Sequence, residues 1–247
     1  MDRPVNLIKM GGSIITRKNS YRYFRSQVAS KMIKEIMEID GEKIIVHGGG
    51  SFGHIKSLEY GIPGEITPKR LAGASLVHSD MLELSSRIAG LFASLGEKPY
   101  IFSTSSLFRQ GEMDYAEPVS YLRKGLIPLL FGDTYISGNR VLIYSGDRIM
   151  LDLSRQIKPS KVIFFSDVDG VFTDDPKENP EAKLLQRIKG TAGINATGKD
   201  ATGGMKLKLE TMVEVKRYSK EVYIINGRFP ERIRETDSAD FKGTVIE

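Results

Sequence analysis

The feature that most limits the possible folds of this 247-residue chain is a regular alternation of short apolar segments with longer amphipathic ones. The apolar segments with strand character are Val5–Met10, Lys43–His47, Pro99–Phe102, Ile127–Phe131, Lys161–Ser166, Glu221–Ile225 and Gly243–Ile246. Apolar residues recur at helical spacing in residues 21–39, Leu71–Leu95, Asp147–Ile157 and Gly204–Tyr218. This alternation predicts an α/β fold: a mainly parallel sheet covered by helices on both faces, with a hairpin inserted at Tyr135–Leu142.

The length and the 40% hydrophobic content suit one domain with a substantial core. The best internal boundary lies near residues 158–160, Lys-Pro-Ser, where a helix should end before a new strand begins. We therefore expect a single domain over residues 1–247, made of one half at about 1–160 and another at about 161–247.

Composition excludes some classes of site and partner. The chain has no cysteine, which excludes disulfides, thiolate metal ligands and cysteine nucleophiles. The net charge of +5 is small and the basic residues are dispersed, so neither nucleic acid nor a membrane is an expected partner. No apolar run approaches the ~20 residues of a membrane span, and the N-terminus begins with a strand pattern instead of a signal segment. We expect a soluble, cytoplasmic protein.

The loop at residues 46–55, V-H-G-G-G-S-F-G-H-I, fits two phosphate-binding patterns in part. Its glycines satisfy G-x-G-x-x-G, the dinucleotide fingerprint, directly after a predicted strand. That fingerprint also requires an acidic residue about 20 positions on, at the end of a second strand. The segment in that region, Tyr60–Glu65, contains two glycines and a proline and therefore cannot be the buried second strand. A Walker A loop requires a lysine where His54 stands, so neither interpretation is supported.

Further glycine turns follow predicted strands or open predicted helices. They are Gly11-Gly12-Ser13, Gly132-Asp133, Gly146-Asp147 and Gly203-Gly204. Ligands of open α/β sheets bind at the carboxyl ends of the strands, and a pocket with this many bare amides suits several phosphate groups in a row. Lys9 supports the same interpretation, because a lysine inside an apolar strand is costly unless its ammonium group meets an anion.

Taken together, these motifs resemble those of the amino-acid kinase superfamily. The segments that occur in that superfamily's order are Lys9–Ser13, His47–Gly50, Ser166–Phe172 with Asp175-Pro176 after it, Gly203–Lys208 and Gly243–Ile246. Within the superfamily the chain most resembles the isopentenyl phosphate kinases, through Gly11–Lys18, His47–His54, Tyr144–Asp147, Asn226-Gly227 and Pro230–Ile233. The fosfomycin kinases share the second histidine of the loop, so His54 separates these two branches from the others without separating them from each other.

The resemblance implies an α/β/α sandwich with an acceptor-binding half at about 1–160 and a nucleotide-binding half at about 161–247. It implies transfer of the γ-phosphoryl group of ATP to a monophosphate, giving isopentenyl diphosphate for isoprenoid synthesis by an alternative mevalonate route. Mg²⁺ would be carried by ATP, with no metal ligand assigned to the protein, and a homodimer is expected. The irregular segment Asp174–Asp200 would be a flap on the nucleotide side.

The roles implied for single residues follow from the problem of bringing two polyanions together. An acceptor phosphate monoester is already largely a dianion at neutral pH and needs no general base. Each pair of unit charges ~4 Å apart repels by roughly 4 kcal/mol at an effective dielectric constant of about 20. By resemblance, the catalytic residues are Lys9, Lys18, His54, Asp147 and Lys208. The ATP-binding residues are Lys9, Gly11, Gly12, Ser13, Gly50, Asp167, Gly204 and Lys208, and the acceptor-binding residues are Gly49, Gly53, His54 and Gly132.

Within these sets, Asp147 is expected between the ammonium groups of Lys9 and Lys208, and Lys18 on a flexible loop. Lys206 lies beside Lys208 in the sequence, and only the family spacing favours Lys208.

The three histidines have different expected roles. His54 would donate a hydrogen bond to the non-attacking oxygens of the acceptor phosphate. His47, at the end of a strand, should pack and orient the glycine loop, and His78 has no assigned role.

Two alternatives stay open. One is a kinase of the same fold that acts on fosfomycin or another small phosphonate or monophosphate. The other, less favoured, is a nucleotide-binding regulator that transfers nothing. In the kinase interpretation, the helix at Leu71–Leu95 should line an apolar pocket for the tail of the acceptor.

Overall fold

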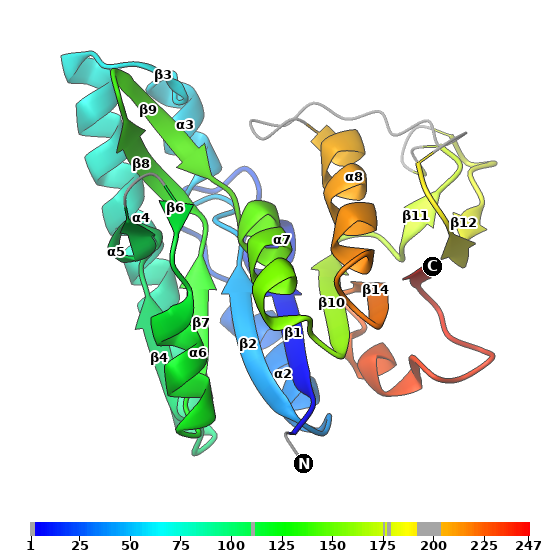
Figure 1. Ribbon diagram of the computed structural model, residues 1–247. Helices are drawn as coiled ribbons and strands as arrows, with labels where there is room; N and C mark the ends of the chain where they lie inside the picture. Colours follow the sequence, from blue (N-terminus) through cyan, green and yellow to red (C-terminus); the bar gives the residue numbers. More distant parts are fainter. Residues whose placement is uncertain (1–2, 110–111, 175, 177–178, 192–203) are drawn as a thin grey trace.

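The protein is built around one central sheet with helices on both faces (Figure 1). The computed structural model describes residues 3–109, 112–174, 176, 179–191 and 204–247. Among these residues the central sheet has eight strands, in the order β13-β15-β14-β10-β1-β2-β7-β4. Its neighbouring strands are parallel except for β14 and β15. The expected α/β/α sandwich with a mainly parallel sheet is confirmed.

The strands of the central sheet are β1 (Val5–Met10), β2 (Glu42–His47), β4 (Pro99–Phe102), β7 (Ile127–Phe131), β10 (Lys161–Ser166), β13 (Arg187–Ile188), β14 (Glu221–Asn226) and β15 (Thr244–Ile246). The helices are α1 (Gly12–Ile15), α2 (Ser26–Met37), α3 (His54–Glu59), α4 (Pro68–Ser94), α5 (Thr104–Leu107), α6 (Ala116–Arg123), α7 (Gly146–Ile157), α8 (Gly204–Lys216) and the 3₁₀ helix η1 (Pro230–Glu235). A smaller sheet consists of β3 (Gly64–Glu65), β9 (Arg140–Tyr144) and β8 (Asp133–Ser137). Two short ribbons are β5 (Phe108–Arg109) with β6 (Glu112–Met113), and β11 (Val171–Phe172) with β12 (Leu184–Leu185).

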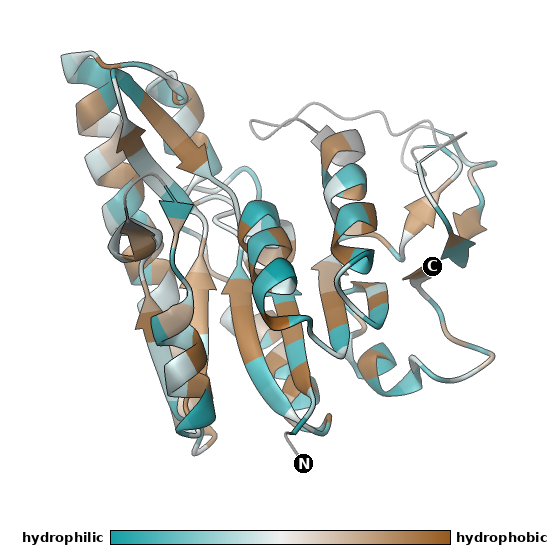
Figure 2. Ribbon diagram, in the orientation of Figure 1, coloured by the Kyte–Doolittle hydropathy of each residue, from teal (hydrophilic) through white to brown (hydrophobic). Residues whose placement is uncertain are grey.

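The central strands are apolar on both faces because helices cover both. Ile8 and Met10 of β1 belong to the core under α2 and α4, whereas Leu7 belongs to the core under α6, α7 and α8. Successive side chains of a strand point to opposite faces, so a strand buried on both sides has a continuous apolar run. Figure 2 shows this as strands that are largely brown beneath helices with teal outer faces.

The parallel strands end at the same level. In the register of the sheet, Met10 lies beside His47 and Phe165, and His47 lies beside Phe131. The residues that follow these strand ends belong to the motifs singled out in the sequence: Gly11, Gly48, Gly132 and Asp167. The sheet therefore brings motifs from distant parts of the chain to one edge.

Two helices begin three or more residues away from their expected starts, for identifiable reasons. α4 begins at Pro68 instead of Leu71, because the side chain of Thr67 accepts a hydrogen bond from the Arg70 amide and proline suits the first helical turn. α2 covers Ser26–Met37 and not residues 21–39, because the residues before it form a closed loop that is described below.

The expected internal boundary falls where α7 ends. Lys158 has a left-handed backbone (φ 48°) and terminates the helix before β10. The central-sheet strands from residues up to 160 lie on one side of the sheet and the later ones on the other, with β1 beside β10 at the junction. The assignment of acceptor and nucleotide to these two halves stays a prediction. Across the described ranges, no helix combines the length and the apolar character needed to cross a membrane.

Candidate active site

The centre of the candidate site is an ion pair between strand β1 and helix α7. Lys9 Nζ lies 2.5 Å from Asp147 Oδ1, and the two side chains are only 12% and 11% exposed. The helix is fixed at this end by Ser145, whose side chain accepts a hydrogen bond from the Arg148 amide. Lys9 thus meets its anion within the protein, and this contact holds its ammonium group in place.

A groove of about 320 Å³ opens between α7 and α8 beside this ion pair. The residues that line it are Ser145, Asp147, Arg148, Leu151, Leu207, Lys208, Glu210, Thr211 and Glu214. Asp147 therefore contacts Lys9 and shares the groove with Lys208, which is partly buried. Gly204 begins α8, while the side chain of Lys206 lies outside the described part of the chain.

The glycine loops that follow β1 and β2 touch one another directly. A Cβ on Gly12 would overlap the backbone of Gly50, and one on Gly48 would lie 2.9 Å from the Gly12 nitrogen. Gly50 has φ +49°, in the left-handed region, and a Cβ there would overlap Thr16 Oγ1. We expected Gly50 to admit a phosphate, but the contact between the loops by itself already requires glycine at these positions.

The short helix α1 follows β1 after one intervening residue. Gly12 and Ser13 open this helix, and amides in a first turn have no acceptor within the helix. Gly11 precedes it in an extended conformation, and a Cβ on Gly11 would overlap the Phe165 carbonyl of β10. Free amides at the positive end of a helix favour an anion.

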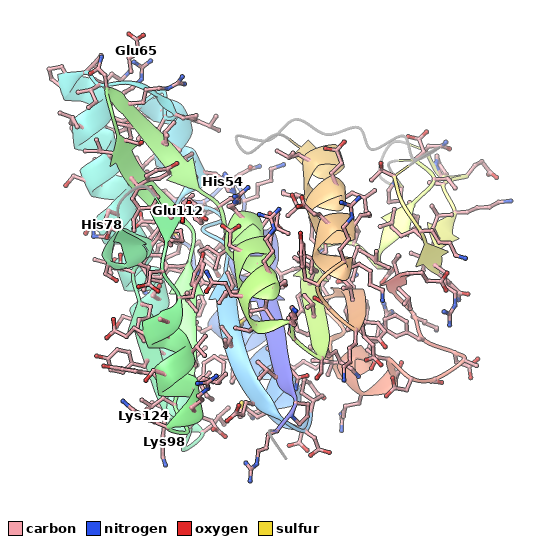
Figure 3. The ribbon with its side chains drawn as sticks, viewed as in Figure 1. His54, Glu65, His78, Lys98, Glu112 and Lys124 are labelled. Carbon is pink, nitrogen blue, oxygen red and sulfur yellow. The ribbon has the colours of Figure 1, made fainter. Side chains whose placement is uncertain are left out.

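His54 begins α3 at the end of the second glycine loop. Its amide donates to the Gly50 carbonyl at 2.9 Å, and its side chain is partly exposed. Figure 3 labels His54 above the carboxyl ends of the central strands. Gly49 and Gly53 lie against α4: a Cβ on either would be 2.9 Å or 3.5 Å, respectively, from Met81 Sδ. The loop is therefore packed on α4 on one side and presents His54 at the edge of the sheet.

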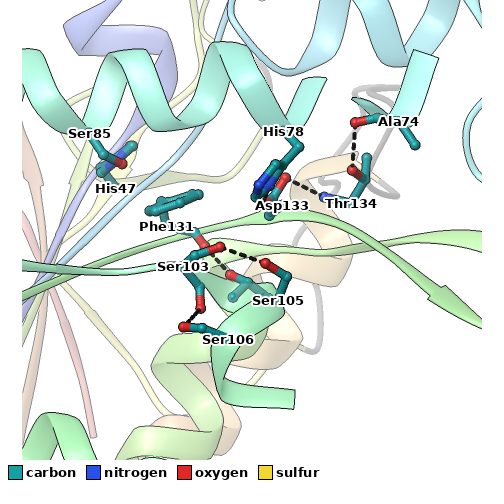
Figure 4. Close-up of polar contacts among 11 residues, drawn as sticks. His47, Ala74, His78, Ser85, Ser103, Ser105, Ser106, Phe131, Asp133 and Thr134 are labelled. Carbon is teal, nitrogen blue, oxygen red and sulfur yellow. Dashed lines mark hydrogen bonds and ion pairs between the residues drawn. The ribbon is translucent and has the colours of Figure 1, made fainter. Parts of the chain in front are cut away.

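His47 is fully buried beneath this loop. Its Nε2 lies 2.7 Å from Ser85 Oγ on α4, its Nδ1 lies 3.3 Å from the Gly48 carbonyl, and its ring stacks on Phe131 (Figure 4). Burial lowers the pKa of His47 to about 4, so the imidazole is neutral at physiological pH. This geometry matches the expected role of packing and orienting the loop.

A second histidine contact, which we did not expect from the sequence, joins α4 to the strand after Gly132. His78 Nδ1 lies 2.5 Å from Oδ2 of the buried Asp133, whose Oδ1 accepts the Thr134 amide at 2.7 Å (Figure 4). Burial raises the pKa of Asp133, and the hydrogen bond from His78 opposes that rise. A Cβ on Gly132 would lie 2.8 Å from the Gly146 nitrogen, so this turn is closed against the start of α7. In the sequence, the only sign of this contact was Asp133 itself, an aspartate after a glycine turn. Its partner His78 lies 55 residues away in the chain.

In the half from residue 161 onward, Asp167 follows β10 and is partly buried. Two residues on, Asp169 Oδ1 lies 2.5 Å from Arg232 Nη1 and 3.1 Å from Asn226 Nδ2. Burial would raise the pKa of Asp169, but these hydrogen bonds bring it below its usual range. The segment expected to be an irregular flap contains β12 and β13, and β13 pairs with β15 in the central sheet, so the interpretation as an irregular loop is wrong for this part. The parts of the segment at 175, 177–178 and 192–200, and Gly203, lie outside the described residues.

Lys18 lies on an arm, residues 16–24, between α1 and α2. The ends of the arm pair as an antiparallel bridge. The amide of Ser20 donates to the Arg17 carbonyl at 3.1 Å, so the exposed Lys18 lies within a turn. We expected a flexible loop, and the structure shows one that is closed at its base and turned at its tip.

The sheet register, the loop contacts and the shared groove bring most of the predicted site residues to one edge of the sheet. These residues are Lys9, Gly11, Gly12, Ser13, Gly49, Gly50, Gly53, His54, Gly132, Asp147, Asp167 and Lys208. Their individual roles stay predictions.

Comparison with known proteins agrees with this arrangement. Residues 4–226 match the amino acid kinase family. The isopentenyl phosphate kinase of Thermoplasma acidophilum is 40% identical over 97% of this chain and 99% of its own length. That of Methanothermobacter thermautotrophicus is 31% identical over 97% and 98%. The crystal structure of the T. acidophilum enzyme in its product complex has a TM-score of 0.89 at 38% identity, covering 98% of this chain and 100% of that one.

The chain therefore belongs to the amino acid kinase family. Its resemblance to the isopentenyl phosphate kinases within that family, expected from the motifs, is confirmed across nearly the whole chain.

Proposed function

We propose that this protein transfers the γ-phosphoryl group of ATP to isopentenyl phosphate, releasing isopentenyl diphosphate and ADP. The observation that carries the proposal is the 40% identity to an isopentenyl phosphate kinase over 97% of the chain, together with a shared fold. The product would enter isoprenoid synthesis by an alternative mevalonate route.

The reaction would be a direct in-line transfer, because the acceptor phosphate is its own nucleophile. The protein would supply position and positive charge. Lys9 and Lys208 would contact the β- and γ-phosphates and the transferred group, with Asp147 holding the Lys9 ammonium group. The 2.5 Å contact of Lys9 with Asp147 and the groove shared by Asp147 and Lys208 support this assignment. The amides of Gly12 and Ser13 would bind the ATP phosphates.

Mg²⁺, brought by ATP, would neutralise part of the charge on the β- and γ-phosphates. As the resemblance implies, the proposal assigns no metal ligand to the protein. The carboxylate at the centre of the site, Asp147, forms an ion pair with Lys9.

On the acceptor side, His54 would donate to the non-attacking oxygens of the acceptor phosphate, and the loop that contains Gly49 and Gly53 would surround it. The position of His54 at the carboxyl edge of the sheet supports this role. Fosfomycin or another phosphonate remains the second candidate acceptor, but the relatives that cover nearly the whole chain do not favour it.

Coupled ADP release with isopentenyl phosphate tests the activity, with fosfomycin and other small monophosphates compared by kcat/KM. The proposal is abandoned if folded protein turns over another acceptor better than isopentenyl phosphate, or turns over none.

The role of His54 is tested by His54→Ala and the matched His54→Gln, which keeps a neutral donor. Removing a donor to the transferring or accepting phosphate should lower kcat/KM for isopentenyl phosphate by about a hundredfold, with the KM for ATP little changed. His54→Gln should recover part of that loss. Equal kinetics for wild type and His54→Ala would remove this residue from the site.

We also propose a homodimer in the cytoplasm, as the resemblance implies. Light scattering after size-exclusion chromatography should give twice the 27.5 kDa of one chain. A mass of one chain at micromolar concentration would contradict the dimer.

A further inference from the structure

Helix α4 carries a carboxylate on the face that it buries. Asp80 is 4% exposed, on a face whose other members are largely apolar. A buried carboxylate is costly unless it is compensated. The compensation comes from the arm: Tyr21 Oη donates to Asp80 Oδ2 at 2.6 Å, and Arg22 Nε lies 3.5 Å from Oδ1.

The arm reaches α4 through an unfavourable backbone conformation. Arg22 has φ 56°, in the left-handed region that L residues rarely adopt unless contacts hold them there. Its guanidinium group pairs with Asp80 and also with Glu83, one turn further along α4. Glu83 is itself held by Arg87, with an N–O distance of 2.6 Å. The surrounding contacts therefore determine where Arg22 lies.

Tyr21 lies where the arm meets both helices of the acceptor side. Its hydroxyl bonds to Asp80 of α4, while Lys56 Nζ of α3 lies 4.9 Å from the centre of its ring. α3 is the helix that begins at His54. Burial, with the hydrogen bond to Asp80, raises the pKa of Tyr21 to about 12, so the phenol stays protonated and able to donate.

The other end of the arm is attached to the two glycine loops. The hydroxyl of Thr16, fully buried, donates to the Gly12 carbonyl at 2.7 Å and accepts from the Ser51 amide at 2.9 Å. Lys18 follows two residues later. The arm is thus fixed at its base by the site loops and on its far side by α4, with Lys18 between the two attachments.

We propose that Asp80 is a positioning residue for Lys18: by holding Tyr21 and Arg22, it fixes the arm so that Lys18 is presented to the transferring phosphoryl group. Asp80 itself touches neither substrate. The inference rests on the proposed function and on the role of Lys18 in it.

The experiment is a double-mutant cycle of Asp80→Asn with Lys18→Ala, measured by ADP release with ATP and isopentenyl phosphate. A misplacement of about 1 Å can cost up to a hundredfold, so Asp80→Asn should lower kcat by about tenfold with the KM for ATP unchanged. In the Lys18→Ala background the same substitution should change kcat by less than about twofold, because its effect is exerted through Lys18. If Asp80→Asn costs the same factor in both backgrounds, Asp80 does not act through Lys18 and the inference is wrong.

A second pair of variants tests the same contact while keeping the buried carboxylate of Asp80. Tyr21→Phe removes the hydroxyl that binds Asp80 and keeps the ring against Lys56. Tyr23→Phe is the matched control, because Tyr21 and Tyr23 are 42% and 45% exposed on the same arm and the Tyr23 ring lies against Arg17 of the arm itself. Tyr21→Phe should lower kcat and Tyr23→Phe should leave it unchanged. Equal effects of the two would overturn the inference even if Asp80→Asn fails to fold.

Wild-type turnover separates this inference from the proposed function. No transfer to isopentenyl phosphate by wild type refutes the function, and the inference with it. If wild type transfers normally and the effects of Asp80→Asn and Lys18→Ala on kcat are additive, only the role of Asp80 is refuted and the proposed function stands.

Discussion

Lowering the pH from about 7.5 to about 5 should destabilise this protein through His47, which the fold buries in its neutral form. Among the residues that the structure describes, the imidazole has no charged partner: its nitrogens face the Ser85 hydroxyl and the Gly48 carbonyl, and Phe131 covers its ring. A proton on this ring would have to be accommodated without solvent. The unfolded chain carries no such restriction.

The magnitude follows from the two pKa values. The pKa of His47 is about 4 in the folded protein against an ordinary value of 6.5. Because the folded value is the lower one, the unfolded state binds more protons between them, and the free energy of unfolding falls as the pH falls. The contribution is complete above the unfolded pKa and is lost progressively towards the folded one. The linkage amounts to about 2 kcal/mol lost at pH 5 and about 3 kcal/mol below pH 4.

The assay is urea unfolding followed by circular dichroism at several pH values, since the chain has no tryptophan. His47→Gln is the reference, because its amide can still bond to Ser85 and does not titrate. Other titrating groups contribute to both proteins, so the difference between the two curves isolates His47. If that difference changes by less than about 0.5 kcal/mol between pH 7.5 and 5, His47 is not held neutral and the reasoning fails.

Other substitutions test the remaining parts of the site. Asp147→Asn leaves the ammonium group of Lys9 without its buried partner and should lower kcat by about a hundredfold, in steady-state kinetics with both substrates saturating; normal kcat would contradict the assigned geometry. Gly50→Ala should cost at least about 2 kcal/mol in urea unfolding, since it combines a left-handed backbone with an overlap. Gly138→Ala is its control, because Gly138 has φ +55° and open space around the position of a Cβ. An equal loss of unfolding free energy in both variants would mean that the structure relieves the overlap at residue 50. Ser145→Ala removes the cap of α7 and should cost about 1 kcal/mol, while an unchanged midpoint would show that the cap contributes nothing.

The described central strands, apart from β13 (Arg187–Ile188), and the edge where the site lies could be predicted from the sequence, because both follow from local patterns. Runs such as residues 127–131 are apolar at every position, which indicates burial on both faces. Parallel strands also place whatever follows them at a common edge, so Gly11 and Gly132 could be assigned to one site before any contact was known.

The small elements and the reasons behind the glycines could not be predicted in this way. α6 has only eight residues, and helices this short give a weak periodic signal. Gly12 and Gly50 suggested an approach to phosphate, whereas their most direct requirement is the contact between their own loops. Whether a glycine accommodates a phosphate or a neighbouring loop depends on how separate segments of the chain meet. The local sequence does not determine that.

By itself, the sequence of this protein determined where most central strands lie, which face of the longer helices is apolar and which residues reach the carboxyl edge of the sheet. Only the tertiary structure decided that Lys9 is paired with Asp147, that His78 holds Asp133 and that Asp80 holds the arm with Lys18. The physical reason is one of range: periodicity arises from neighbours a few residues apart, whereas a buried charge finds its partner across 55 to 138 residues of chain. The partner is selected by the folded packing as a whole.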